Sequence, residues 1–323
     1  MIFICAQPDV PYFHWQIRML FFNFEKFGII KKCRAVFGLM NGAQEPSEGL
    51  KKLLRDYPDN IHFYKDSRLN RSYIPSIKPH LVKHYLKEHP QDGKCIFLTD
   101  SDILFRQLPD FGSMLFDDVS YVSECPGYID YNYIKGCCDR YKSEYPQLGD
   151  IELLESMADK VGVPVDVIQR NNNNSGGAQY LIKDTDYHFW HKVDRDCNRI
   201  YDTTMEFGKR YPIPAHIQFW TAEMWAILWN MWYFEKETAL HPELAFSWAT
   251  DPVSRYEERN IFHLAGILDE MKKEKFYKGE FINKCPFTEY KNNPEKFQNY
   301  SPNFGAIKYV EEIKRFVESK RPY

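Results

Sequence analysis

The sequence lacks several features by which common classes of protein are identified. No Gly-x-Gly-x-x-Gly motif follows the first strand-like run, and residues 7–11 read Gln-Pro-Asp-Val-Pro instead. This absence disfavours a dinucleotide-binding dehydrogenase, and also a nucleotidyltransferase with its usual glycine-rich phosphate loop. The eight cysteines include no Cys-x-x-Cys pair, and several lie in apolar runs where a thiol packs as a small hydrophobic group. We therefore expect all eight to be reduced.

A long uncharged hydrophobic run and a large excess of one charge are also absent. The most apolar stretch, residues 217–234, contains Gln218, Glu223 and Asn230, which predicts a buried helix rather than a membrane span. The N-terminus enters a strand pattern without a basic region or a cleavage site, so secretion is not expected. The formal net charge of −3 indicates no global basic field for nucleic acid. We expect a cytoplasmic protein that does not bind membranes.

What is present is an extensive apolar core and a regular alternation of strands and helices. The 323 residues are 44% hydrophobic and 16% aromatic, enough for a large buried core. Strand-like runs fall at residues 2–5, 33–39, 61–64 and just before residue 100, with helical patterns between them. This alternation predicts a single α/β domain with a Rossmann-like, mostly parallel sheet flanked by helices. Ligands are expected at the carboxyl ends of the strands.

Two carboxylates stand at the end of the fourth strand-like run. Asp100 and Asp102 have apolar residues on both sides, as in the interior of a sheet. An acidic pair is costly there unless a cation or hydrogen bonds compensate its charge. Asp-x-Asp also occurs by chance in solvated turns and helix caps, so the motif alone leaves both interpretations open. Hard cations such as Mn²⁺ or Mg²⁺ prefer carboxylate oxygens and leave positions for phosphate, which favours a metal site.

A single histidine near the other end of the chain strengthens the metal interpretation. Residues 259–266 form a short apolar run that presents His263 and then Gly266. A lone histidine on such a run is ordinarily a core residue, but here it accompanies an upstream Asp-x-Asp. The combination resembles the nucleotide-sugar-dependent glycosyltransferases of the A-type fold. That resemblance implies that Asp100, Asp102 and His263 share one Mn²⁺ or Mg²⁺ ion.

The same resemblance implies which residues contact the two substrates. Gln7, Lys78, Asp100, Ser101 and Asp102 are expected to bind the donor, with Lys78 as a point charge beside its diphosphate. Residues 170–182 form a polar loop that turns into a strand through Gly176 and Gly177, which suggests either a close ligand or a hairpin turn. The resemblance favours the ligand. It implies acceptor contacts by three residues: Gly177, Gln179 and Trp248.

Two carboxylates compete for the role of catalytic base. Glu223 lies near the start of a helix that is apolar almost all round, where it either complements the helix dipole or faces the cleft. Many A-type transferases carry an acidic residue on this helix, so we prefer Glu223 by a small margin. Asp251 is the rival. The sequence does not decide between inversion and retention of the anomeric centre.

The last 57 residues combine lysines with aromatic residues. They contain 12 Lys and Arg and 9 Asp and Glu, a local net charge of +3. Aromatic rings among lysines can stack on nucleic-acid bases, but more often they pack a lobe over the sheet. We prefer packing, since the acidic residues would weaken a phosphate-binding surface.

Two subgroups of A-type transferases resemble different parts of the chain. Residues 12–20 and 73–79 resemble hydroxyproline O-arabinosyltransferases and peptidyl-serine galactosyltransferases. Residues 175–180 and 217–225 look more like the viral and base J-type transferases that glycosylate hydroxymethylated pyrimidines in DNA, which would place a viral protein in the host cytoplasm. We expect a nucleotide-sugar-binding half at 1–110, an acceptor-side half at 111–266 and a helical, aromatic C-terminal lobe at 267–323.

The expected function is transfer of a sugar from a UDP-sugar to an acceptor hydroxyl, with 5-hydroxymethylpyrimidine in DNA as the preferred acceptor. A hydroxyproline, serine or glycan acceptor is the alternative. A sugar-nucleotide binding protein without turnover, or a nucleotidyltransferase, is less favoured. The sequence does not indicate an oligomeric state.

Overall fold

The residues that the structure describes, 1–125, 127–321 and 323, form a seven-stranded sheet flanked by helices and a second, three-stranded sheet. The structure is a computed structural model. The strands of the large sheet are β1 (Ile2–Pro8), β2 (Cys33–Leu39), β3 (Ile61–Lys65), β4 (Cys95–Leu98), β6 (Ser120–Glu124), β7 (Gly176–Lys183) and β8 (Thr238–Leu240). Their order is β3-β2-β1-β4-β7-β6-β8. The predicted α/β class with a mostly parallel sheet is confirmed.

Strand direction divides this sheet into parallel and antiparallel parts. β1 pairs in parallel with β2, and β2 with β3. β6 and β8 are also parallel, whereas β7 runs antiparallel to both β4 and β6. The small sheet has the order β5-β10-β9, from β5 (Ile103–Phe105), β10 (Ile261–His263) and β9 (Phe246–Trp248).

By compactness the chain divides into two units. Unit 1 comprises residues 67–98 and 112–241 with Met1, and unit 2 comprises residues 2–66, 99–111 and 242–323. The division predicted at residues 110 and 266 separates parts by their expected function rather than by compactness, and it stays a prediction. Within the described residues, no helix is long and apolar enough to span a bilayer. All eight cysteines are described and are thiols, as predicted.

Unit 2 contains the first three strands and the helices that connect them. Helix α1 (Pro11–Lys26) begins with a proline at its first turn and buries Trp15, Met19 and Phe22, which lie on one face of the helix. Helix α2 (Glu48–Asp56) begins at Ser47, whose hydroxyl accepts a hydrogen bond from the Leu50 N–H at 3.2 Å. The proline of α1 and the Ser47 cap of α2 favour the start of each helix at these positions.

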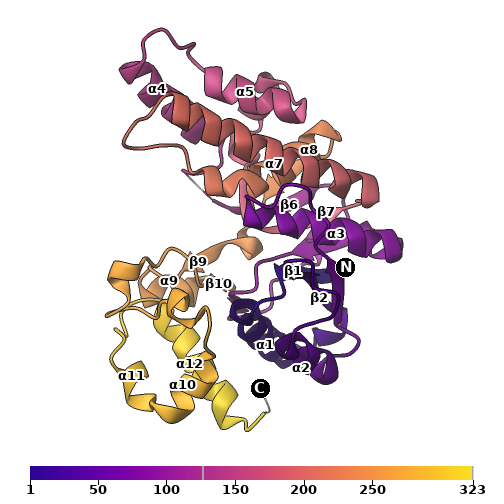
Figure 1. Cartoon of the computed structure of the whole chain (residues 1–323), viewed down its shortest axis with the longest axis vertical. Coiled ribbons are helices and arrows are strands. Elements are labelled where there is room, and N and C mark those ends of the chain that lie inside the picture. Colours follow the sequence, from indigo (N-terminus) through magenta and orange to yellow (C-terminus); the bar gives the residue numbers. More distant parts are fainter. Residues whose placement is uncertain (126, 322) are drawn as a thin grey trace. The chain divides into compact units, whose positions relative to one another are not determined.

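The C-terminal part of unit 2 is a lobe of short helices around an aromatic core. The helices are α9 (Val253–Glu258), α10 (Pro286–Asn292), α11 (Pro294–Gln298) and α12 (Ala306–Glu318), of which α10, α11 and α12 are drawn in yellow and orange in Figure 1. Phe276, Phe281, Phe287, Phe297 and Tyr300 are all buried in one cluster with Trp15 and Tyr309. The preferred interpretation of the aromatic residues as packing is confirmed for these five, which have no face left for stacking on a base.

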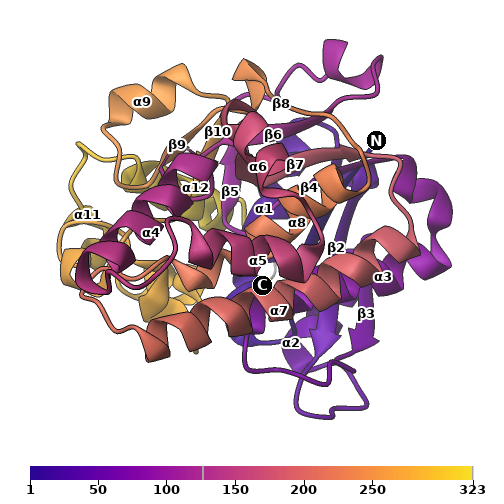
Figure 2. The same cartoon turned by 90° about the horizontal axis from the view of Figure 1, so that it is seen from above.

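Unit 1 is organised by a helix that the sequence analysis did not predict. Helix α7 (Tyr187–Arg210) has 24 residues and packs against α3 (Ile77–Glu88), α5 (Glu152–Val161) and α8 (Ala222–Tyr233), as Figures 1 and 2 show. The many charged residues of α7 make the periodicity of its buried apolar residues difficult to recognise in the sequence. Helices α4 (Tyr131–Glu144) and α6 (Val165–Arg170), also not predicted, complete the unit.

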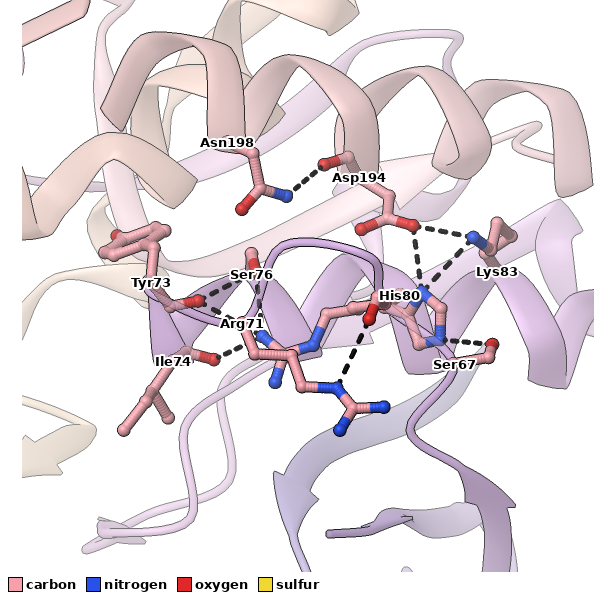
Figure 3. Close-up of polar contacts among 10 residues, drawn as sticks. Ser67, Arg71, Tyr73, Ile74, Ser76, His80, Lys83, Asp194 and Asn198 are labelled. Carbon is pink, nitrogen blue, oxygen red and sulfur yellow. Dashed lines mark hydrogen bonds and ion pairs between the residues drawn. The ribbon is translucent and has the colours of Figure 1, made fainter. Parts of the chain in front are cut away.

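A polar network fixes the segment that leads into α3 (Figure 3). The buried Arg68 guanidinium donates to the carbonyl oxygens of Tyr73 and Ile74 and to the Ser76 hydroxyl, at 2.8–3.2 Å. His80 on α3 lies 3.1 Å from the Ser67 hydroxyl and 3.0 Å from the Asp194 carboxylate on α7.

Lys83 shares this network, because its ammonium also donates to Asp194 at 2.6 Å. The carboxylate is therefore already neutralised by a lysine, and the chain of contacts ties α3 to α7. Lys78 lies on the same anchored helix, so its backbone position is fixed by the network.

Candidate metal centre and catalytic residues

The predicted Asp-x-Asp lies in the turn that follows β4 and leads directly into β5. The carbonyl oxygen of Asp102 accepts a hydrogen bond from the Leu264 N–H at 3.0 Å, which joins this turn to the residue after His263. Ser101 is buried, and its hydroxyl donates to the Gln16 side-chain oxygen on α1 at 2.7 Å. Ser101 therefore fixes the turn between the two carboxylates. Its predicted contact with the donor is not tested.

His263 reaches the two carboxylates from the small sheet. It is the last residue of β10 and pairs in register with Ile103 of β5. Its Nε2 atom lies 3.3 Å from Asp102 Oδ1 and 3.6 Å from Asp100 Oδ2. The Trp248 ring stacks on the imidazole, with ring centroids 5.6 Å apart, and holds its plane. The structure thus brings the three predicted ligands together.

The donor set fits a hard divalent cation. One ligand atom each from Asp100, Asp102 and His263 lies within 4.8 Å of the others. Ligands that share one ion at about 2.1 Å stand about 3 Å apart at neighbouring positions, so small side-chain adjustments suffice. Two carboxylates and one imidazole suit Mn²⁺ or Mg²⁺ and leave several positions for oxygens of a ligand.

Lys278 is a member of this cluster that the sequence analysis missed. Its ammonium forms an ion pair with Asp102 Oδ2, and Asp102 is only 3% exposed. Burial alone would raise the pKa of Asp102, but the charges of Lys278 and His263 outweigh it and hold that pKa well below its ordinary value. Burial alone would lower the pKa of Lys278, whereas Asp102 and Tyr12 hold it above the ordinary value.

No motif in the sequence could have identified Lys278, because it stands 176 residues from its partner among many other lysines.

Other residues predicted for the site lie in unit 2 with different partners. Gln7 is buried near the end of β1, and its amide lies 3.7 Å from the Cys5 sulfur. Asp251 Oδ2 accepts a hydrogen bond from the Trp248 N–H at 2.8 Å, and the Asp251 carbonyl accepts one from Gly305. Asp251 therefore closes a turn, which is a sufficient structural reason for a carboxylate at this position.

Unit 1 holds a second predicted pair. The Lys78 ammonium lies 2.8 Å from Glu223 Oε1, and both side chains are buried. Residues predicted for two separate roles therefore neutralise each other. The Glu223 N–H donates to the Tyr73 hydroxyl at 3.1 Å, and that hydroxyl donates to the Trp220 carbonyl at 2.5 Å. This contact fixes the first turn of α8 and hence the position of Glu223.

Gly177 and Gln179 lie in β7 and are fully enclosed by protein. A Cβ atom at Gly177 would stand 2.4 Å from the Met224 side chain, and one at Gly176 would stand 2.3 Å from the Ser123 carbonyl. Both glycines thus have a packing reason inside unit 1. Ala178 between them and Gln179 has a φ of +64°, a conformation costly for a residue with a Cβ. The acceptor roles of Gly177 and Gln179 stay predictions.

The chain is also similar to several solved structures. They include the bifunctional glycosyltransferase WbbM without ligand (8% identity, TM-score 0.43), aligned over 98% of this chain and 51% of that one, so this chain spans about half its length. A glycosyltransferase involved in glycosylation of the major capsid of PBCV-1 aligns over 83% of this chain and 95% of that one, with 8% sequence identity and a TM-score of 0.37. Mouse xyloside xylosyltransferase 1 aligns over 81% of this chain and 96% of that one, with 10% sequence identity and a TM-score of 0.33.

No protein-family model matches the sequence, and no curated protein matches it significantly. Structural similarity at this level carries no argument about function, so the function must be argued from the residues of the site.

Proposed function

We propose that this protein is a metal-dependent glycosyltransferase that moves a sugar from a UDP-sugar to an acceptor hydroxyl. The observation that carries the proposal is the cluster of Asp100, Asp102 and His263, since Asp102 and His263 are 3% and 5% exposed. Lys278 supplies one positive charge to the two acidic side chains, and further counter-charge is needed when an anionic diphosphate is to bind beside them. A divalent cation that also binds a diphosphate meets this need.

Each part of the proposed reaction has a residue of the chain to support it. Asp100, Asp102 and His263 would hold the ion, which when bound neutralises the charge that builds on the leaving diphosphate. Ser101 keeps the two carboxylates in position through Gln16. Glu223 is the proposed proton acceptor, and its carboxylate forms an ion pair with Lys78. Asp251 is the weaker candidate, because its carboxylate already closes a turn.

For the acceptor we propose the hydroxymethyl group of a modified pyrimidine in DNA. The support is the resemblance of residues 175–180 and 217–225 to transferases of that class. The aromatic residues of the C-terminal lobe add no support, because five of them are buried in its core. A hydroxyl of a protein or a glycan is the alternative acceptor class.

The test is incubation of the protein with Mn²⁺ and a panel of nucleotide sugars, with release of free nucleotide as the readout. Hydroxymethylated DNA, a hydroxyproline peptide and a simple glycan serve as acceptors in parallel. Nucleoside mass spectrometry should show a gain of one hexose on hydroxymethylated DNA with UDP-glucose. Release of pyrophosphate instead would indicate a nucleotidyltransferase. Binding of a nucleotide sugar without release under any condition would indicate a binding protein, and the proposal would then be wrong.

A further inference from the structure

Asp102 has a different partner on each of its two carboxylate oxygens. Oδ1 faces His263 Nε2 at 3.3 Å, and Oδ2 is paired with the Lys278 ammonium. The Asp102 side chain is 4% exposed and the Lys278 side chain 28% exposed. The negative charge of Asp102, one of the two carboxylates proposed to bind the ion, is therefore already balanced by a cation from the protein itself.

The main chain of Lys278 is fixed, whereas its side chain is long. Lys278 opens a short 3-10 helix, Lys278–Phe281, that ends in a fully buried phenylalanine. The Trp15 indole N–H donates to the Phe281 carbonyl at 3.1 Å, and the Phe276 and Phe281 rings stack 5.2 Å apart. The backbone is thus held in the lobe core. The four rotatable bonds of the lysine side chain let the ammonium change partner by rotamer changes alone.

We propose that Lys278 is an internal counter-cation that exchanges partners when the donor binds. In the donor-free protein its ammonium neutralises Asp102, so a divalent cation alone binds weakly. When a nucleoside diphosphate arrives, the ammonium moves to a diphosphate oxygen, and both oxygens of Asp102 become available to the ion. Metal and donor then bind cooperatively. This inference rests on the proposed function, because it requires one site for the ion and the diphosphate.

Charge explains why the coupling must run in both directions. An ammonium on a metal ligand repels a divalent cation, so removing it strengthens metal binding by itself. If the nucleotide removes the same repulsion, it raises metal affinity, and the metal must raise nucleotide affinity by the same factor. Couplings of this kind are typically about 5- to 150-fold. We expect at least about 10-fold here.

The experiment is a calorimetric titration of the whole chain with Mn²⁺, with and without saturating UDP. In the natural protein UDP should raise Mn²⁺ affinity about 10-fold or more. In Lys278→Met, Mn²⁺ affinity without UDP should rise about 10-fold, and UDP should raise it about 10-fold less than in the natural protein, because only the direct contact between diphosphate and ion remains. Lys272→Met is the matched control, because Lys272 lies in the same segment, is partly exposed and pairs locally with Asp269 at 3.1 Å. It should behave as the natural protein.

Lys278→Gln keeps a hydrogen-bond donor without the charge and should reproduce the Lys278→Met result, which covers the case in which methionine prevents folding. Lys278→Arg keeps the charge and should retain the coupling. Unchanged Mn²⁺ affinity in folded Lys278→Gln or Lys278→Met overturns the partner exchange while leaving the proposed function intact. If neither Mn²⁺ nor UDP binds the natural protein, the proposed function and this inference both fail.

Discussion

At the scale of single residues, Asp102 is the side chain on which most of the candidate site depends. It contacts His263 and Lys278 through its carboxylate and Leu264 through its carbonyl group. Asp102→Asn keeps the size of the side chain and removes its charge. We expect Mn²⁺ affinity to fall about 100-fold or more, since even indirect partners of a metal contribute about 10- to 100-fold. EDTA should abolish activity in the natural protein.

Metal titration followed by calorimetry measures the effect of Asp102→Asn, with Asp118→Asn as the control at an exposed position. His263→Ala should weaken Mn²⁺ binding by a smaller factor, because water can replace one neutral ligand. Full activity in Asp102→Asn together with tight UDP binding would contradict the metal assignment.

Glu223 is the second residue with a specific expectation. Glu223→Gln retains a side chain of the same size but leaves the buried Lys78 ammonium without its counter-charge, so stability should fall while the fold and donor binding persist. Turnover should fall about 100-fold or more, the usual contribution of a general base. Steady-state kinetics that separate kcat from KM measure this effect. If Glu223→Gln has a normal kcat while folded Asp251→Asn is inactive, the role belongs to Asp251.

At the scale of secondary-structure elements, the network between α3 and α7 gives stability a defined pH dependence. Burial alone would raise the pKa of Asp194, but hydrogen bonds from His80 and Lys83 lower it below its ordinary value of 3.8. A carboxylate with a depressed pKa stabilises the folded state above pH 3.8, and this contribution is lost as the pH falls below that value.

Asp194→Asn should therefore destabilise the protein by roughly 3 kcal/mol at pH 7, because it leaves Lys83 buried without its counter-charge. The difference from the natural protein should shrink below about pH 4. Urea unfolding at several pH values measures it, with Asp202→Asn on the exposed side of the same helix as the control. A difference that stays constant down to pH 3 would show that the charge of Asp194 does not matter.

The pairing of β6 with β7 depends on a glycine. A Cβ atom at Gly176 would meet the Ser123 carbonyl at 2.3 Å, and backbone atoms of a central sheet cannot move aside cheaply. We expect Gly176→Ala to destabilise the fold by about 3 kcal/mol. Gly136→Ala in α4 is the opposite case, since its nearest contact is 3.9 Å away and alanine favours helices by about 0.5–1 kcal/mol. In thermal unfolding, Gly176→Ala should lower the melting temperature and Gly136→Ala should raise it.

At the scale of the whole molecule, charge and burial limit how nucleic acid can be bound. The net charge is −3, and the aromatic residues of the C-terminal lobe are largely inside its core. If DNA carries the acceptor, binding must rely on a few phosphate contacts. Affinity for hydroxymethylated DNA should then be modest. A plot of the logarithm of the binding constant against the logarithm of the salt concentration should have a slope of about −0.9 for each phosphate contact. Fluorescence anisotropy across a salt series measures this slope, and a slope of zero would exclude phosphate contacts.

The sequence by itself determined the elements whose signals are local. The alternation in the first hundred residues predicted β1 to β4 and the helices between them, because hydrophobic periodicity and caps such as Ser47 act within a few residues. Another local signal is Gly162 at the end of α5, whose φ of +80° suits glycine. Helix α7 was not predicted, because its charged residues outnumber the buried apolar residues that carry the helical periodicity.

The tertiary structure decided which side chains meet. Residue types and motif order indicated Asp100, Asp102 and His263, and the fold brought them to within 4.8 Å. Only the fold could show that Lys78 pairs with Glu223, that Asp251 closes a turn and that Lys278 neutralises Asp102. These contacts join residues far apart in the chain, and one lysine in a sequence looks like any other. Periodicity fixes which face of an element is buried, but partners across the core are fixed by packing alone.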